Sequence, residues 1–218
     1  MTTFPNSPRV LKGGLVLLDA ASAAVLRVIA LQYNPDTLTR SFQIQAVGES
    51  GDRSEAFRIK GPPVESIKIE AHIDATDQLE FPDRNPAVLE SGIQSQLAAL
   101  ETILYPPTDQ LQANQQLAQS GVLEILPVEA PLLLFVWSRY RIVPVRLTEL
   151  SITEEAFDPR LNPIRAKVSL GMRVLSVNDV GFDSKAGSLY ILYQQQKERF
   201  ASRARDAAFG ALGIGGIP

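Results

Sequence analysis

The sequence predicts a mainly β fold with helices (α+β), and two kinds of periodicity indicate this class. In Glu65–Ile73, apolar residues alternate with Lys68, Glu70 and His72, which is typical of a half-buried strand. The same alternation returns in Ile164–Val174. Apolar residues with helical spacing occur in the middle of the chain and again near its end,. Strands combined with one central and one terminal helix fit a β-barrel or sandwich with a helix packed against it.

The composition is that of a globular protein with a substantial core. The chain has 218 residues, of which 45% are hydrophobic and 21% are charged, so extensive disorder is not expected. The formal net charge of −3 gives no strong field that would attract nucleic acid or an anionic membrane. The absence of cysteine excludes disulfides, thiolate metal sites and cysteine nucleophiles.

The first third of the chain is expected to form an arm and four strands. Two prolines prevent a helix in the arm, and small residues between two apolar runs suit a hairpin. In the third strand, Leu38, Phe42 and Ile44 are the expected core positions. In order, the segments are an extended arm Met1–Lys12, strands Leu15–Leu18 and Val25–Tyr33 joined through Asp19–Ala24, a strand within Thr37–Val47, a polar loop Gly48–Ser54 and the strand Glu65–Ile73.

The rest of the chain is expected to form helices and three more strands. A continuous apolar run predicts a central strand that is buried on both faces, and paired prolines stop the helix that precedes it. In order, the segments are a loop Asp74–Pro86, a helix Val88–Leu104 ended by Tyr105-Pro106-Pro107, a short helix or exposed insertion Asp109–Gln119, the central strand Leu132–Trp137, strands Ile142–Thr153 and Ile164–Val174, and a terminal packing or docking helix Ser188–Leu212.

The last predicted strand has one apolar and one polar face. The polar face carries Arg165, Lys167 and Arg173, so it is expected to face solvent, a lumen or a partner rather than the core. The resulting organisation is an arm at 1–12, a β-barrel domain at 13–178, and a C-terminal helix with a Gly-rich tail at 179–218.

No catalytic, cofactor-binding or metal-binding residue is predicted, and the chain is not expected to be an enzyme. The single histidine, His72, lies on the polar face of a strand, without a cysteine that could help to complete a zinc site. Glu154 and Glu155 are adjacent and would face opposite sides of a strand. One acidic loop could bind Ca²⁺, but it lacks the glycine and terminal glutamate of an EF-hand and is interpreted as solvated. Its carboxylates are Asp74, Asp77, Glu80 and Asp83.

The remaining local signals concern turns and the two ends of the chain. Asn34-Pro35, Asp158-Pro159 and Asn162-Pro163 are interpreted as turn formers, because the residue before proline avoids the helical region. Gly210–Gly216 is interpreted as a helix stop and tail. Neither a secretory signal nor an apolar run of about 18 residues is recognised. Folding in the cytoplasm is therefore expected, with any export as part of a particle.

Three segments, taken in order, resemble the tube-initiator or adaptor proteins of extracellular contractile injection systems, of the antifeeding-prophage kind. The first is Val28–Pro35, a strand that runs into a Tyr-Asn-Pro motif. The second is Pro63–Ala71, followed by an acidic loop and a helix. The third begins at Pro144–Leu147 and leads through Glu154–Pro159 to Asn162-Pro163 and the final strand. The resemblance covers roughly Leu15 to Val177.

This resemblance implies a phage tail-tube or Hcp-like β-barrel with a flanking helix and, here, a C-terminal helical extension. It implies a hexameric ring at the baseplate that joins the trimeric spike to the inner tube and initiates tube assembly. The implied partners are further copies of the chain, the inner tube protein, the spike (VgrG-like) protein and baseplate wedge proteins. No cofactor, nucleic acid or direct membrane insertion is implied. The particle would assemble in the cytoplasm and be either released or membrane-anchored.

One departure from the family and three alternatives remain. Some relatives carry a C-terminal LysM module, whereas here only a helix and a Gly-rich tail follow the last strand. The chain could instead be a cap or another baseplate protein of the same machine. It could also be a monomeric β-barrel ligand binder, with Trp137 lining the pocket. An enzyme would require His72 to converge with the carboxylates of Asp74–Asp83, which strand alternation does not favour.

Overall fold

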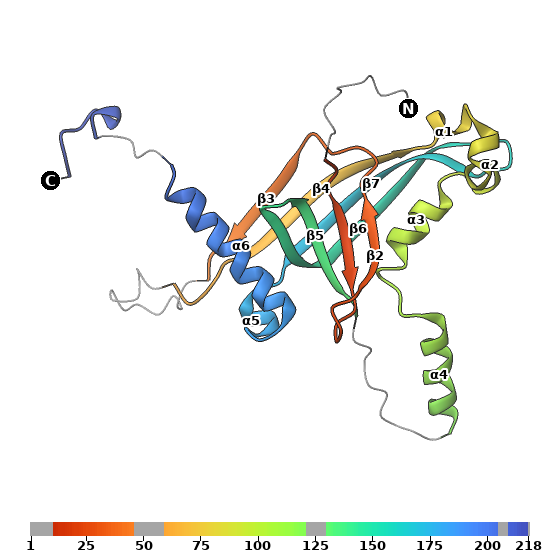
Figure 1. Cartoon of the computed structure of the whole chain (residues 1–218), viewed down its shortest axis with the longest axis horizontal. Coiled ribbons are helices and arrows are strands. Elements are labelled where there is room, and N and C mark those ends of the chain that lie inside the picture. The colour runs from red at the N-terminus through yellow and green to blue at the C-terminus, as the bar shows by residue number, and fades with distance from the viewer. Residues whose placement is uncertain (1–10, 46–58, 121–129, 205–208, 218) are drawn as a thin grey trace.

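Seven antiparallel strands form one sheet in the order β2-β1-β5-β6-β7-β4-β3 (Figure 1). The computed structural model describes residues 11–45, 59–120, 130–204 and 209–217. The predicted class, mainly β with helices, is confirmed. The strands are β1 Gly14–Leu18, β2 Val25–Ala30, β3 Leu38–Gln43, β4 Val64–Asp74, β5 Leu132–Ser138, β6 Arg141–Phe157 and β7 Pro163–Val174. The helices are α1 Thr76–Leu79, η1 Pro82–Arg84, α2 Pro86–Ser91, α3 Gln94–Glu101, α4 Thr108–Gln119, α5 Val177–Val180, α6 Lys185–Ala201 and η2 Phe209–Leu212.

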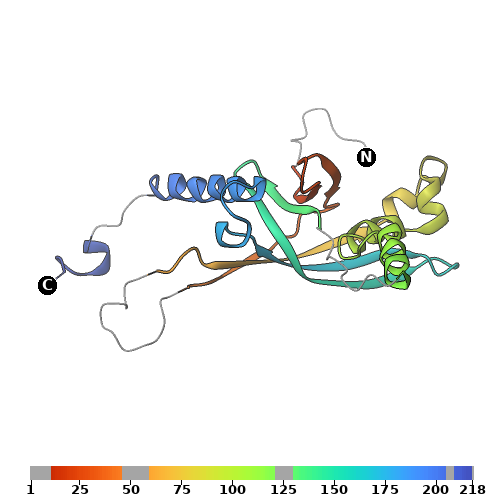
Figure 2. The ribbon, with the colours of Figure 1, turned by 90° about the horizontal axis from the view of Figure 1, so that it is seen from below.

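Strand β6 belongs to both halves of the sheet and so folds it into two layers. Its first residues, up to Val145, pair with β5, and from Val145 onward it pairs with β7. A register shift between Leu147 and Glu149 lies just beyond this point, and such bulges bend strands. The half made of β2, β1 and β5 therefore stands over the half made of β6, β7, β4 and β3 (Figure 2).

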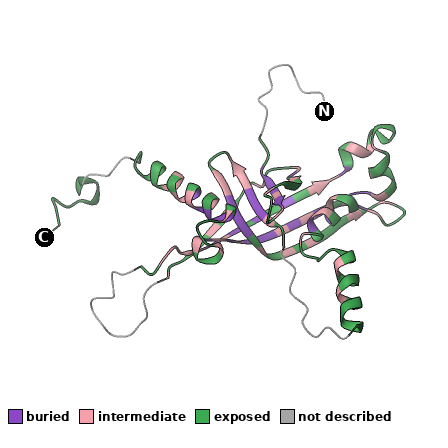
Figure 3. Cartoon of the chain, turned by 60° about the horizontal axis from the view of Figure 1, so that its bottom comes forward, coloured by how far each residue is buried: buried purple, intermediate pink, exposed green. Residues whose placement is uncertain are grey.

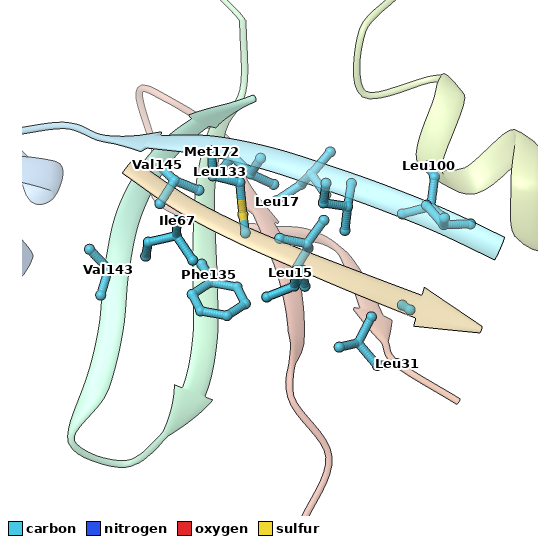
Figure 4. Close-up of a cluster of buried hydrophobic side chains, with 14 of the residues drawn as sticks. Leu15, Leu17, Leu31, Ile67, Leu100, Leu133, Phe135, Val143, Val145 and Met172 are labelled. Atoms are coloured by element: carbon cyan, nitrogen blue, oxygen red, sulfur yellow. The ribbon is translucent and has the colours of Figure 1, made fainter. Parts of the chain in front are cut away.

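The hydrophobic core fills the space between these two layers. Phe135 on β5 and Leu15 on β1 lie toward Ile67 on β4 and Met172 on β7 (Figure 4), and all four side chains are almost inaccessible to solvent. The alternation predicted for β4 and β7 is confirmed, because their odd and even positions separate into buried and more exposed rows. The central strand predicted at Leu132–Trp137 is also confirmed, since consecutive residues Leu133–Phe135 are buried.

A glutamine side chain connects the β2 end of the sheet to strand β4. Edge strands β2 and β3 follow each other in the chain, and Gln32 lies in the segment between them. Its Nε2 donates to the carbonyl oxygen of Asp74 at 2.6 Å, and the Asp74 N–H donates to its Oε1 at 2.9 Å. The Gln32 amide thus donates one hydrogen bond and accepts one, as the backbone of a paired strand residue would, and it links the segment after β2 to the end of β4.

We expect Gln32→Ala to lower the free energy of unfolding by about 1–3 kcal/mol, because it leaves the partly buried backbone N–H and C=O of Asp74 without these hydrogen bonds,. Hydrogen exchange of the Asp74 amide should accelerate while exchange in the paired part of β4 is retained. Gln115→Ala on exposed α4 serves as the control and should change neither quantity. Unchanged protection of the Asp74 amide in Gln32→Ala would contradict the closing role of this side chain.

The single helix predicted over Val88–Leu104 is wrong, because it is divided at Gly92 into α2 and α3. Gly92 has φ +59°, and a Cβ at this position would lie 2.0 Å from the carbonyl oxygen of Pro163. The Ile93 N–H donates to that same oxygen at 2.8 Å. The chain turns here to bring the helices against the β6–β7 turn. The loop predicted over Asp74–Pro86 contains α1 and η1.

The terminal helix is shorter and rotated compared with the predicted Ser188–Leu212. It begins at Lys185, where the Ser184 hydroxyl caps it by accepting from the Gly187 N–H at 2.9 Å, and it ends at Ala201. The apolar stripe predicted for this helix comprises Leu189, Leu192, Tyr193, Gln196, Phe200, Ala204, Ala207 and Leu212. It is correct at Tyr193, which is buried, and wrong at Leu192, Phe200 and Leu212, which are exposed. The buried residues are Ala186, Gly187, Tyr190 and Tyr193, and the predicted position Ala207 lies outside the described residues.

Two expected core positions, one on β3 and one directly after it, are also wrong. Leu38 packs against the core, but Phe42 is 49% exposed and Ile44 is 72% exposed. The reason is that β3 forms the end of the sheet, where a side chain has a neighbouring strand on one side only. The predicted loop Gly48–Ser54 and residues 1–10 of the predicted arm lie outside the described residues.

Candidate assembly surfaces

One face of the four-stranded layer is polar along its whole length. The β3, β4, β7 and β6 registers align residues that point away from the core, including the cross-strand pair Glu70 and Ser169 and the pair Ser151 and Ser169. This face consists of Thr39, Ser41 and Gln43 on β3; Ser66, Lys68, Glu70 and His72 on β4; Arg165, Lys167, Ser169, Gly171 and Arg173 on β7; and Arg146, Glu149, Ser151 and Thr153 on β6. The prediction that the β7 polar face avoids the core is confirmed.

The charges on this polar face are largely paired with one another. Lys167 Nζ lies 2.8 Å from Glu70 Oε1, and Lys68 Nζ lies 3.4 Å from Glu149 Oε2. These side chains are solvent-exposed, so each pair contributes little to stability. Their effect is on the potential of the surface, because cations and anions alternate and no strong field of one sign develops. Such a face suits contact with water over a wide area.

The same layer ends in two strand edges. The β3 strand is the last of the sheet and pairs only with β4 among the described strands. Among the described strands, β6 pairs with β7 alone from Glu149 to Phe157, because its pairing with β5 ends at Val145. Exposed edges offer unpaired N–H and C=O groups to another strand. The described part of this layer therefore presents two edges, on opposite sides of one polar face.

The edge strand β2 exposes large apolar side chains but is partly covered by a helix. Val25, Leu26 and Val28 are 62%, 56% and 64% exposed. Between them, Arg27 reaches α3, where its guanidinium donates to the Ala99 carbonyl at 3.2 Å and to the Thr102 hydroxyl at 2.8 Å. This contact fixes α3 beside β2 and leaves the apolar residues as a separate exposed group.

A buried carboxylate holds α6 against the start of β4. Glu65 is 3% exposed, and it accepts from Arg40 Nε at 2.8 Å, from the Tyr193 hydroxyl at 2.9 Å and from Lys197 Nζ at 2.9 Å. Arg40 also donates to the Tyr193 hydroxyl at 3.0 Å. Phe42 lies under the Arg40 guanidinium, 4.8 Å from ring centre to Cζ. The cluster connects β3, β4 and α6 through charge-assisted hydrogen bonds.

The cluster shifts the pKa of its two acidic groups in opposite directions. Burial alone would raise the pKa of Glu65, but the hydrogen bond and charge of Lys197, together with Arg40 and Tyr193, outweigh it and hold this pKa below its usual value,. Burial, and then the negative charge of Glu65, raises the pKa of the Tyr193 phenol. Glu65 is therefore ionised and Tyr193 protonated at neutral pH.

Helix α4 has no buried residue although it is twelve residues long (Figure 3). Leu111 and Leu117 are 51% and 47% exposed, and the helix projects from the body of the molecule (Figure 1). Isolated helices of this length are marginal in water. The segment Asp109–Gln119 was predicted to be either a short helix or an exposed insertion, and it is both helical and exposed.

The candidate catalytic and metal residues do not converge. His72 is exposed on the polar face, as predicted, and no group of three metal-ligating side chains that could hold an ion is found within the part of the chain described here. Asp74, the last residue of β4, accepts from the N–H of Thr76 at 2.8 Å, so its carboxylate is engaged in the turn that leads into α1. Glu155 forms an ion pair with Arg165. Asp77, Glu80, Asp83 and Glu154 are exposed.

A cleft of about 490 Å³ lies between β2, β4, β7 and α3. Ala71, Leu100, Val168 and Leu170 belong to its apolar lining, and Gln78, whose Oε1 is buried without a hydrogen-bond partner among the described atoms, lies at its side. Trp137 is not part of this lining. Its ring stacks on Phe135 with centroids 5.9 Å apart and lies against Gly13.

The two Asn-Pro motifs do more than form turns. Asn34 accepts from the Gly13 N–H at 2.9 Å and donates to the Leu11 carbonyl at 2.7 Å, which fixes the strand that enters the sheet. Asn162 donates to the Glu90 carbonyl at 3.0 Å and to Asp158 at 2.9 Å, which fastens the β6–β7 turn to α2. The hydrogen bond from Asn162 holds the pKa of Asp158 below its usual value.

The comparisons with known proteins give a distant likeness only. No protein-family model and no curated protein matches the chain. Among solved structures, a chain from "Tail of empty GTA particle computed with helical refinement, C6 symmetry" matches at 14% identity and a TM-score of 0.29, covering 74% of this chain and 90% of that one. A chain from "Virion of native gene transfer agent (GTA) particle" matches at 14% identity and a TM-score of 0.28, with the same coverage. Within the described residues, no helix has the length and apolar character to cross a membrane.

Proposed function

We propose that the chain is a non-catalytic structural subunit of a contractile, phage-tail-like injection particle. In this role, six copies join edge to edge into a ring at the baseplate, between the spike and the inner tube, and this ring initiates tube assembly. The observation that carries the proposal is the four-stranded layer, in which a polar face is bounded by two strand edges that have no partner among the described strands. The motif order from Val28–Pro35 to Asn162-Pro163 is the sequence-level support.

The two edges differ from each other, so they fit a ring better than a two-fold dimer. When β3 of one copy pairs with Glu149–Phe157 of β6 in the next, the contact is heterologous and every copy retains one edge of each kind. A rotation that closes after a fixed number of copies removes all free edges of this layer. The polar faces then form one continuous lining around a water-filled channel, which matches their paired charges.

Lysine substitutions on the two edges test this arrangement. We expect Thr39→Lys/Ser41→Lys on β3, and separately Ser151→Lys/Thr153→Lys on β6, to reduce the oligomer to monomers, because charged side chains on an edge oppose strand addition. All four residues are exposed and point away from the core, so the fold should be retained. Ser169→Lys on the same face of the inner strand β7 is the control. Loss of the oligomer in the control as well as in the edge variants would contradict edge-to-edge assembly.

The role in an injection particle is tested by isolating the tagged chain from its native host. Mass spectrometry of the eluate should identify tube, spike and baseplate wedge proteins, and negative-stain electron microscopy should reveal rod-shaped particles. Sheath and cap proteins without spike or wedge proteins would assign the chain to another part of the machine. A monomer without any of these partners would reject the proposal.

The cleft between β2, β4 and α3 favours a second candidate function, that of a monomeric ligand binder. Its volume of about 490 Å³ is within the range of small-molecule sites, and the unpartnered Gln78 Oε1 would accept a hydrogen bond from an apolar ligand with one N–H or O–H donor. Indole is a suitable probe. Saturable binding of indole by a monomer, lost in Leu100→Trp, would favour this function, whereas no binding at millimolar indole would remove it.

A further inference from the structure

The edge strand β3 carries large apolar side chains that its own copy leaves exposed. Phe42 on β3 is 49% exposed, and Ile44, directly after the strand, is 72% exposed. Strand alternation places both in the same row as Leu38, which packs against the core,. The apolar row of the four-stranded layer therefore continues to its free edge, and contiguous exposed apolar surface is typical of a contact site.

A positive charge accompanies this apolar row. Arg40, in the same row of β3, and Lys197 on α6 both form ion pairs with the single carboxylate of Glu65. Tyr193 completes the cluster, but burial raises the pKa of its phenol, so it is neutral. Two cations and one anion leave one positive charge in excess, and it lies next to the free edge because Arg40 belongs to β3.

The charges around the cluster do not remove this excess. Arg141 is a further cation whose charge acts on the same tyrosine. The carboxylate of Asp179 is occupied by an ion pair with Arg173. Glu198 on α6 is exposed, but exposed Arg199 follows it directly. The β3 edge therefore favours a partner that brings apolar side chains and one carboxylate.

The second half of β6, the other edge of the same layer, has these features. Leu150 and Ile152 lie in its apolar row and are partly buried against the core. Glu154 comes next in this row; it is exposed and forms no ion pair with a cation of the described residues. The order apolar, apolar, carboxylate along β6 is the reverse of the order cation, apolar, apolar along β3, with every second residue used in both strands.

The backbones of the two edges are compatible with antiparallel pairing. Each strand of the layer is antiparallel to its neighbour, so the outer strands β3 and β6 run in opposite directions. Rotation about a ring axis preserves this relation between neighbouring copies. Hydrogen-bonded and non-hydrogen-bonded positions alternate in every pair, so the same row points its N–H and C=O groups outward on both edges. The two apolar rows can thus meet without exchanging faces.

We infer that β3 of one copy pairs with Leu150–Glu154 of β6 in the next copy in one particular register. This inference rests on the proposed ring and specifies its joint. The opposed pairs are Arg40 with Glu154, Phe42 with Ile152 and Ile44 with Leu150 on the apolar side, and Ser41 with Thr153 and Gln43 with Ser151 on the polar side. No like charges meet in this register, and the excess charge of the cluster is neutralised.

The two neighbouring registers that keep the faces aligned are less favourable. A shift of two residues in one direction places Phe42 opposite Glu154. A shift in the other direction places Arg40 opposite Ile152 and Leu38 opposite Glu154. Each of these registers packs a charged group against an apolar one, which costs free energy unless the charge is paired.

Disulfide cross-linking measures the register, because the chain has no cysteine of its own. Ser41→Cys/Thr153→Cys places two cysteines directly opposite each other across the joint, where Cα atoms lie about 4.5–5.5 Å apart and a disulfide can form. Ser41→Cys/Ser151→Cys is the matched control, because its cysteines are diagonal neighbours about 7–8 Å apart, too far for a disulfide. All three residues are exposed on the polar face, so both variants should fold. Within one copy, β4 and β7 separate the two edges, so only a bond between copies can form.

Mild oxidation of assembled Ser41→Cys/Thr153→Cys is expected to give a ladder of covalent oligomers on a non-reducing gel, whereas the control remains monomeric on the same gel. A ladder from the control, or rings in electron micrographs without cross-links in either variant, would overturn the register and leave the ring itself intact. An unmodified chain that forms no ring would instead reject the proposed function, and with it this inference.

Discussion

Replacing Gly92 with alanine is expected to lower the free energy of unfolding by about 3–5 kcal/mol. Two effects add. Gly92 has φ +59° and ψ −132°, a region that costs a residue with a side chain about 1–3 kcal/mol. The new Cβ would also lie 2.0 Å from the Pro163 carbonyl oxygen, and overpacking of this kind costs about 1–3 kcal/mol. The backbone atoms that it meets cannot rotate away.

Gly181→Ala separates these two effects. Gly181 also has a positive φ, +69°, with ψ 157°, but nothing lies within 4 Å of a Cβ at that position. We therefore expect a loss of only about 1–3 kcal/mol. Urea unfolding of both variants measures the difference. If Gly92→Ala were no less stable than Gly181→Ala, the close packing of α2–α3 on the β6–β7 turn would be incorrect.

Glu65→Gln is expected to cost about 2–4 kcal/mol of unfolding free energy. The substitution keeps the size of the side chain but removes the charge that Arg40 and Lys197 neutralise, and breaking a buried ion pair from one side costs about 3–5 kcal/mol. Arg40 and Lys197 are 26% and 31% exposed, so solvent can compensate part of the loss.

The control for this prediction is Glu70→Gln on the same strand. Glu70 forms an ion pair with Lys167 at the same short distance, 2.8 Å, but its side chain is 48% exposed. Exposed pairs contribute about 0–1 kcal/mol. Equal losses in the two variants, measured by urea unfolding, would mean that the Glu65 cluster does not hold α6.

The pH dependence of stability should show the same carboxylate. Because the folded state lowers the pKa of Glu65, its stabilising contribution is fully present above its ordinary value of 4.5 and is lost as the pH falls through the lower, folded-state value. Asp19, Asp74 and Asp158 have lowered pKa values too and add loss of the same sign. The difference between the unmodified chain and Glu65→Gln isolates Glu65, and this difference should shrink toward zero as the pH is lowered.

The sequence predicts strands and their buried faces best where apolar residues recur periodically. The alternation in β4 and β7 and the apolar run in β5 were sufficient to locate the strands and their buried rows, because burial of one face imposes period two. Glu65 could have been found in the same way. It shares the odd-numbered positions of Ile67 and Ile69, so its carboxylate is expected on the core side and needs partners there.

The structural features that the sequence did not predict depend on contacts between residues far apart in the chain. The break at Gly92 follows from Pro163, and the closing role of Gln32 follows from Asp74; neither pair is near in sequence. Phe42 has the apolar character of a core residue, but its position on the last strand of the sheet exposes it. The face of α6 was predicted correctly at Tyr193 but not at Tyr190, which is buried, or at Leu192, which is exposed.

Cryo-electron microscopy of the purified chain tests the central claim most directly, because it images both the number of copies and the strands that join them. The account predicts a closed six-membered ring in which β3 of each copy pairs with the second half of β6 in the next. In that ring Lys68, Glu70 and Ser169 line an open channel. Monomers, or rings in which these residues lie on the outer surface and the two edges remain unpaired, would contradict it.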